Sequence, residues 1–164
     1  MISSLQISDM GTLLKKSPDA IAKLSGSSDF PDIKGIVYLY QTKRGVILAS
    51  RVTGLPYETN PCNSNVFGFH IHQGTSCTGN PENPFAATGG HYNPGNCDHP
   101  HHAGDLPPLF GNNGLALMSV LTNRFTVAEV IGHTVVVHRN PDDFTTQPAG
   151  NSGPKIACGI IRRR

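Results

Sequence analysis

The sequence predicts an all-β protein, built as an antiparallel sandwich or barrel. Short runs rich in β-branched and aromatic residues recur along the chain, with turn residues between them. The 18 glycines and 13 prolines among 164 residues are too many for a helix bundle. Tryptophan is absent, so the core must depend mainly on Val, Ile, Leu and Ala. This length argues for a single domain.

Six runs are predicted as strands, taken in chain order. They lie at 35–41, 46–52, 66–72, 115–121, 134–138 and 156–161. The first two flank the turn Thr42–Gly45 and therefore predict a hairpin. Asp19–Gly26 stays undecided, because Ser17-Pro18 is typical of a helix start whereas the residues after it alternate in type.

Three segments fall outside these runs. Residues 73–109 and 139–154 are irregular and rich in turn residues, and long loops inside a compact domain are usually functional. Residues 1–18 carry weak amphipathic spacing that Gly11 breaks, which predicts a mobile arm, with a short surface helix as the alternative. No linker indicates a second domain.

Charge and hydropathy exclude several classes of protein. The formal net charge is only +2, which disfavours a polybasic nucleic-acid binder. No run approaches the ~18 apolar residues of a membrane-spanning helix. The N-terminal residues do not resemble a secretory signal, so we expect a cytoplasmic protein or one exported with its signal already removed. The 4 cysteines fit one or two disulfides.

Histidine is the unusual component of the chain. Six of the 8 histidines lie between His70 and His102. His70 and His72 close a predicted strand, where residues two apart point to the same face. An isolated pair of this kind is more often two exposed histidines than a metal site.

The long irregular segment 73–109 adds further donors. His91 lies in the run Gly-Gly-His-Tyr-Asn-Pro, and residues 99–105 contain three more histidines and Asp105. Imidazole is a common ligand of zinc and copper, and a carboxylate supplies a hard oxygen. A loop too polar to bury itself needs a cross-link, which metal ligation provides. These residues predict a metal site.

The order of these motifs resembles the copper/zinc superoxide dismutases. The motifs are HxH, GGHxNP, HxHHxGD, GxTxxVH and GNSGxxxACGI, and the resemblance runs from about Asp19 to Ile161. It implies an eight-stranded Greek-key β-sandwich, or flattened barrel, over residues 19–161, with Asp19–Gly26 as its first strand. Residues 73–109 become the zinc loop and 139–154 the loop that shapes the active-site channel. Residues 162–164 are three arginines that follow the last predicted strand, and they are expected to form a solvated basic tail.

The resemblance also implies the two ligand sets. The copper ligands are His70, His72, His91 and His138. The zinc ligands are His91, His99, His102 and Asp105. His91 is then an imidazolate shared by both metals. His102 is preferred to His101 because the family's histidine stands three residues before the aspartate. His101 is expected to be solvated, and His133 to be structural or exposed.

The implied activity converts two superoxide anions to O2 and H2O2 by Cu(II)/Cu(I) cycling, while zinc maintains the geometry. His91 would leave copper on reduction and carry a proton. Asp142 matches a carboxylate that accepts hydrogen bonds from a copper and a zinc histidine. Lys155 stands where the family carries an arginine that guides superoxide. Lysine keeps the charge but loses the planar fork, which predicts a modestly slower enzyme.

Other readings and assignments stay open at this point. A non-enzymatic copper-binding or copper-delivery module of the same fold is the main alternative, and a zinc-stabilised interaction domain is a third. The resemblance pairs Cys77 with Cys158, whereas Cys62 and Cys97 form either a second bridge or two free thiols. Gln147 and Ala149 differ from the acidic residues and threonine of much of the family's channel loop. The chain is expected to be a monomer or a homodimer.

Overall fold

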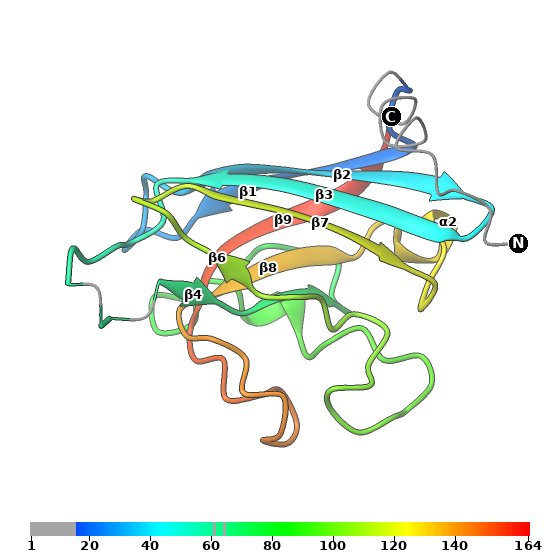
Figure 1. The fold of residues 1–164 in the computed structure, drawn as a ribbon. Helices are drawn as coiled ribbons and strands as arrows, with labels where there is room; N and C mark the ends of the chain where they lie inside the picture. Colours follow the sequence, from blue (N-terminus) through cyan, green and yellow to red (C-terminus); the bar gives the residue numbers. More distant parts are fainter. Residues whose placement is uncertain (1–15, 61, 64) are drawn as a thin grey trace, which may run out of the picture.

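The computed structural model describes residues 16–60, 62–63 and 65–164, and its regular secondary structure is almost entirely β-strand (Figure 1). The strands are β1 (Ala20–Gly26), β2 (Lys34–Thr42), β3 (Gly45–Thr53), β4 (Val66–Phe67), β5 (Phe69–His72), β6 (Leu109–Phe110), β7 (Ala116–Thr122), β8 (Thr134–His138) and β9 (Lys155–Arg163). Two short helices accompany them, η1 (Ala86–Thr88) and α2 (Val127–Val130). Most of the predicted arm, residues 1–15, lies outside the described residues.

The strands form one large sheet and one small ribbon, both antiparallel. The large sheet has the order β5-β8-β9-β1-β2-β3-β7, and β4 pairs with β6. The sheet curls, so that β1, β2, β3 and β7 form one layer and β8 lies in the other with the β4–β6 ribbon (Figure 1). Strand β9 returns from the far end of the chain to pair beside β1, which is a Greek-key arrangement. The all-β antiparallel prediction is confirmed.

The strand predicted at 66–72 is interrupted at Gly68. Its N–H donates to the carbonyl of Asn140 at 2.7 Å, and its carbonyl accepts from the N–H of His138 at 2.8 Å. A Cβ at this position would lie 2.8 Å from the hydroxyl of Ser152, so a glycine is needed for the close approach. The chain therefore changes partners here, from β6 to β8. If β4 and β5 are counted as one interrupted strand, the described residues contain the eight strands that were predicted.

The first and last strands settle two other expectations. Segment 20–26 is strand β1 because it pairs with both β2 and β9, so tertiary pairing overrides the local helix-start signal. Strand β9 continues to Arg163, where Arg162 and Arg163 pair with Ile21 and Ala20. The expectation that the last strand ends before residue 162 was therefore wrong. The three terminal arginines are nevertheless exposed.

Alternation in β5 and β8 places the histidines. All four residues of β5 are buried, but Phe69 and Ile71 point into the main hydrophobic core, and the intervening His70 and His72 point to the opposite side. In β8, Val135 and Val137 likewise face the core. The opposite side of these strands is covered by the two long loops, which hang below the sandwich as the green-to-lime and orange segments (Figure 1).

Two elements leave little trace in the sequence. Strand β6 has 2 residues, too few for a visible alternation. Helix α2 is one turn, fixed by a capping box in which Thr126 accepts from the N–H of Glu129 and the Glu129 carboxylate accepts from the N–H of Thr126. Within the part of the chain that the structure describes, no helix is long and apolar enough to span a membrane.

Candidate metal centre

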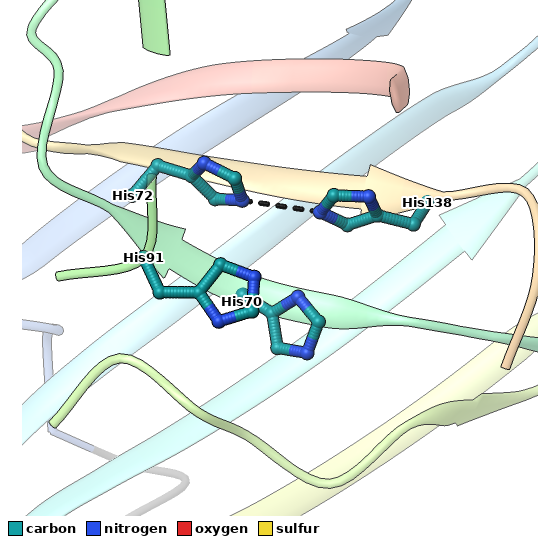
Figure 2. A group of neighbouring side chains, drawn as sticks. All are labelled: His70, His72, His91 and His138. Atoms are coloured by element: carbon teal, nitrogen blue, oxygen red, sulfur yellow. Dashed lines mark hydrogen bonds between the residues drawn. The ribbon is translucent and has the colours of Figure 1, made fainter. Parts of the chain in front are cut away.

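Four histidines from three segments meet on the loop-covered side of the sheet (Figure 2). His70 and His72 come from β5, and His138 from the end of the neighbouring β8. His91 reaches them from the long loop through an isolated β-bridge with His72. All four are buried, and one ring nitrogen from each lies within 4.8 Å of the others. The predicted copper ligands are thus brought together.

The tautomers of His72 and His138 follow from their backbone contacts. His72 Nδ1 lies 2.9 Å from the carbonyl oxygen of Gly89, and His138 Nδ1 lies 3.1 Å from that of Gly153. A carbonyl only accepts, so each Nδ1 carries the proton and each neutral ring has a lone pair at Nε2. The two Nε2 atoms face each other at 3.1 Å, the contact drawn in Figure 2.

Burial keeps these imidazoles neutral. Loss of hydration lowers the pKa of His72 well below 6.5, and the charge of His138 lowers it further. Burial, with the charge of His70, lowers the pKa of His138 to about 3. Two neutral rings whose lone pairs face each other at this distance repel, and a cation between them removes the repulsion. The pair therefore fits a metal ion better than it fits an ordinary hydrogen bond.

Two further nitrogens point to the same conclusion. Among the described residues, His70 Nδ1 and His91 Nε2 are buried and have no hydrogen-bond partner. Buried polar atoms nearly always have a hydrogen-bond partner, so two buried nitrogens without one in the same cluster need an explanation. Nitrogen donors from four imidazoles fit copper well, and zinc as well.

A second group adjoins the first through His91. It consists of His91, His99, His102 and Asp105, whose ligand atoms also lie within 4.8 Å of one another. The three Nδ1 atoms converge on the carboxylate of Asp105, at 2.7 Å for His91, 3.1 Å for His99 and 3.4 Å for His102. Burial raises the pKa of Asp105, but the hydrogen bond of His91 and the charges of the three histidines together lower it overall. Three imidazoles and one carboxylate make a donor set typical of zinc.

Asp142 connects the two groups through one histidine of each. Its carboxylate accepts from His70 Nε2 at 2.7 Å and from His99 Nε2 at 2.9 Å. Burial raises the pKa of Asp142, but these bonds and the N–H of Phe144 lower it to about 2, so the group is ionised. In His70 and His99, Nε2 carries the proton of the hydrogen bond to Asp142. Nδ1 of each ring therefore keeps the lone pair that can bind a metal.

Lys155 lies beside the histidine group, opposite His138 in the β8–β9 pairing. Its ammonium donates to Thr88 Oγ1 at 2.7 Å and to the carbonyl of Gly89 at 3.0 Å. The same carbonyl accepts from His72. Partial burial lowers the pKa of Lys155 from its usual value. The lysine is thus fixed to the wall of the site.

The cysteines and the remaining histidines are also accounted for. Cys77 and Cys158 form a disulfide, which ties the long loop to β9. Cys62 and Cys97 are free and exposed. His101 is exposed. His133 hydrogen-bonds the carbonyl of Gln73 at 2.8 Å and belongs to neither ligand group.

Comparison with known proteins agrees with this geometry. The sequence profile of the copper/zinc superoxide dismutases matches residues 33–161, which is most of the chain. The chain belongs to the copper/zinc superoxide dismutase family. The metals of this family are copper and zinc, and the two donor groups described above suit them.

Several copper/zinc superoxide dismutases from bacteria are similar to this chain. The enzyme of Deinococcus radiodurans is 35% identical over 128 residues, covering 67% of this chain and 70% of its own. That of Photobacterium leiognathi is 34% identical over 142 residues, covering 78% of each chain. A second form from Aquifex aeolicus is 32% identical and covers 80% of each.

Two sets of contacts in this superoxide dismutase centre were not predicted from the sequence. Thr88 and the carbonyl of Gly89 hold Lys155, and Gln147 holds the backbone of His99. A backbone carbonyl leaves no signal in a sequence. The threonine and the glutamine are common residue types whose positions matter only after the loops have folded.

Proposed function

We propose that this chain dismutes superoxide, converting two superoxide anions and two protons to O2 and H2O2. The observation that carries the proposal is the convergence of four buried imidazoles, one of which also belongs to a second donor group. A site that only stores or delivers copper has no need of the second group. The relatives named above are superoxide dismutases, which favours the same reaction.

The proposed ligands follow the two groups. Copper would be held by His70, His72, His91 and His138. Zinc would be held by His91, His99, His102 and Asp105. Bound copper supplies one-electron oxidation and reduction, which zinc lacks. Asp142 keeps the outer nitrogens of His70 and His99 protonated, so that each ring presents Nδ1 to its metal.

His91 is proposed as the proton carrier. Its Nδ1 faces Asp105 in the second group, while its Nε2 is buried without a hydrogen-bond partner among the described residues. Nε2 can therefore take up a proton when it is not a ligand and give it to the peroxide product. Because the other ring nitrogen stays in the second group, the ring keeps its position during this transfer.

Lys155 is proposed to attract the anionic substrate. The formal net charge of +2 is too small for the whole molecule to steer superoxide, so guidance depends on charge near the site. The ammonium of Lys155 is such a charge, opposite His138. Its three N–H groups donate to Phe85, Thr88 and Gly89, so it acts on the substrate as a point charge, whereas arginine would add a planar fork of donors.

One pair of measurements tests the proposal. The purified chain is loaded with copper and zinc, its metal content is measured, and its rate of superoxide decay is followed by stopped-flow absorbance. We expect about one copper and one zinc per chain with fast, catalytic decay. Full copper without dismutation would favour the copper-delivery alternative, and zinc without copper would favour an interaction domain.

The oligomeric state proposed is a monomer or a homodimer. Sedimentation velocity of the metal-loaded protein distinguishes the two. A larger assembly would contradict this part of the proposal.

A further inference from the structure

The side chain of Gln147 pairs with the backbone of His99. Gln147 Oε1 accepts from the N–H of His99 at 3.0 Å, and Gln147 Nε2 donates to the carbonyl of His99 at 2.7 Å. One side-chain amide thus satisfies both backbone groups of His99, as an adjacent strand would. Gln147 is exposed, whereas His99 is 3% exposed.

The loop that carries Gln147 touches His99 at two more points. Asp142 accepts from His99 Nε2 at 2.9 Å. Gly150 lies so close that a Cβ there would be 2.0 Å from Asp142 Oδ1 and 2.7 Å from His99 Nε2. Its φ of +65° also favours glycine. Segment 139–154 is therefore fitted to both the backbone and the ring of His99.

Gln147 also lines the hollow beside His138. This hollow has a volume of about 280 Å³, and its wall includes His138, Gln147, Pro148 and Asn151. The residue that holds His99 in one donor group is thus part of the wall next to the other group. A change in the position of His99 would therefore reach this wall through Gln147, as well as through Asp142 and Gly150.

We propose that Gln147 is a positioning residue for zinc, which fixes the backbone of His99 so that Nδ1 points toward Asp105. The inference rests on the proposed function in assigning zinc to His99. It adds a residue that acts through the backbone of a ligand and does not touch the metal.

The chemistry of the contact dictates the variants. A side-chain amide carries an acceptor oxygen and a donor nitrogen side by side, so it can accept from the N–H and donate to the carbonyl at once. Gln147→Met keeps the length of the side chain and removes both hydrogen bonds. Gln147→Glu keeps an acceptor for the N–H but directs a charge at the carbonyl of His99. Asn151→Asp is the matched control, because it adds the same charge to the same loop and wall and tolerates the positive φ of 49°.

Three measurements are made on the full-length chain. Zinc affinity is obtained by competition with a chelator, the site geometry from the visible absorption of Co(II) bound in place of zinc, and the unfolding free energy from urea denaturation of the metal-free protein. We expect Gln147→Met to weaken zinc binding about tenfold. Gln147→Glu should weaken it further, and both should alter the Co(II) spectrum, while Asn151→Asp matches the unsubstituted chain.

Two results would overturn the inference. One is an unchanged zinc affinity and Co(II) spectrum in Gln147→Met. The other is a loss of metal-free stability that accounts for the whole loss of zinc affinity, since the role would then be only structural. Failure of the proposed function looks different, because the unsubstituted chain itself would then bind no zinc or show no dismutation.

Discussion

The ammonium of Lys155 donates a 2.7 Å hydrogen bond to the hydroxyl of Thr88, a side chain that is completely buried. Thr88 in turn donates to the carbonyl of Phe85 at 2.8 Å, and Phe85 packs against the Cys77–Cys158 disulfide. The cation is therefore anchored to the segment that the disulfide holds. Its distance from the histidine group is set by this segment, and not by a free side chain.

Substitution of Lys155 tests whether this anchored charge guides superoxide. Lys155→Met should lower the second-order rate constant about tenfold or more and flatten its dependence on ionic strength, because the local attraction is lost. Lys155→Arg should keep the salt dependence and raise the rate modestly, since a planar fork gives two oriented hydrogen bonds. Stopped-flow rates over a range of salt concentrations measure both effects. A slower Lys155→Arg enzyme would contradict the argument.

The disulfide should be a major source of stability. It joins residues 81 apart, and closing a loop of that length in the unfolded chain stabilises the fold by about 4 kcal/mol. Replacing Cys77 and Cys158 together by serine should lower the unfolding free energy by this order and weaken copper binding, because His91 lies on the same loop. Urea denaturation measures the first effect and metal content the second. The paired substitution of Cys62 and Cys97, both exposed, is the control and should change neither.

The strands and the ligand residues could be predicted from the sequence, whereas the contacts around them could not. The strands at 35–41 and 46–52 follow from β-branched alternation and a glycine turn, which are local properties, and β2 and β3 contain them. Segment 20–26 could not be assigned locally, because its strand form depends on pairing with β9 at the other end of the chain. The ligand residues carried a motif, so their convergence was predictable.

The supporting contacts could not be predicted, for a physical reason. Gln147 and His99 are far apart in sequence and meet only because two irregular loops pack together. Neither loop has a periodic pattern that fixes its path. The continuation of β9 to Arg163 was missed because charged residues at an exposed strand end resemble a solvated tail.

Asp142→Asn should weaken binding of both metals. Asp142 accepts hydrogen bonds from one histidine of each donor group, and an amide can accept only through its oxygen while its NH2 faces the other ring. We expect losses of about 10- to 100-fold in affinity for copper and for zinc, measured by chelator competition. Glu82→Gln, an exposed change in the long loop, is the control. A loss confined to one metal would show that Asp142 does not connect the two groups.

The metal-free protein should lose stability as the pH falls below about 6.5. Burial lowers the pKa of His72 and His138 in the folded state, to about 3 for His138, while the unfolded chain titrates near 6.5. Between these values the unfolded state binds more protons, so the unfolding free energy decreases as the pH decreases. Each histidine contributes a slope of up to about 1.4 kcal/mol per pH unit. Asp142 has a pKa of about 2 in the folded chain and 3.8 in the unfolded chain, so its protonation lowers the unfolding free energy only as the pH falls toward 3.8 and below.

Urea denaturation of the metal-free chain between pH 7.5 and pH 4.5 measures this slope. His138→Gln should make it shallower by the share of one histidine, because glutamine binds no proton in either state. His101→Gln should leave the slope unchanged, since His101 is exposed. Acid should release metal from the loaded protein over the same range, as protons compete for the nitrogens that hold it. Equal slopes for His138→Gln and the unsubstituted chain would show that His138 is not buried as a neutral ring.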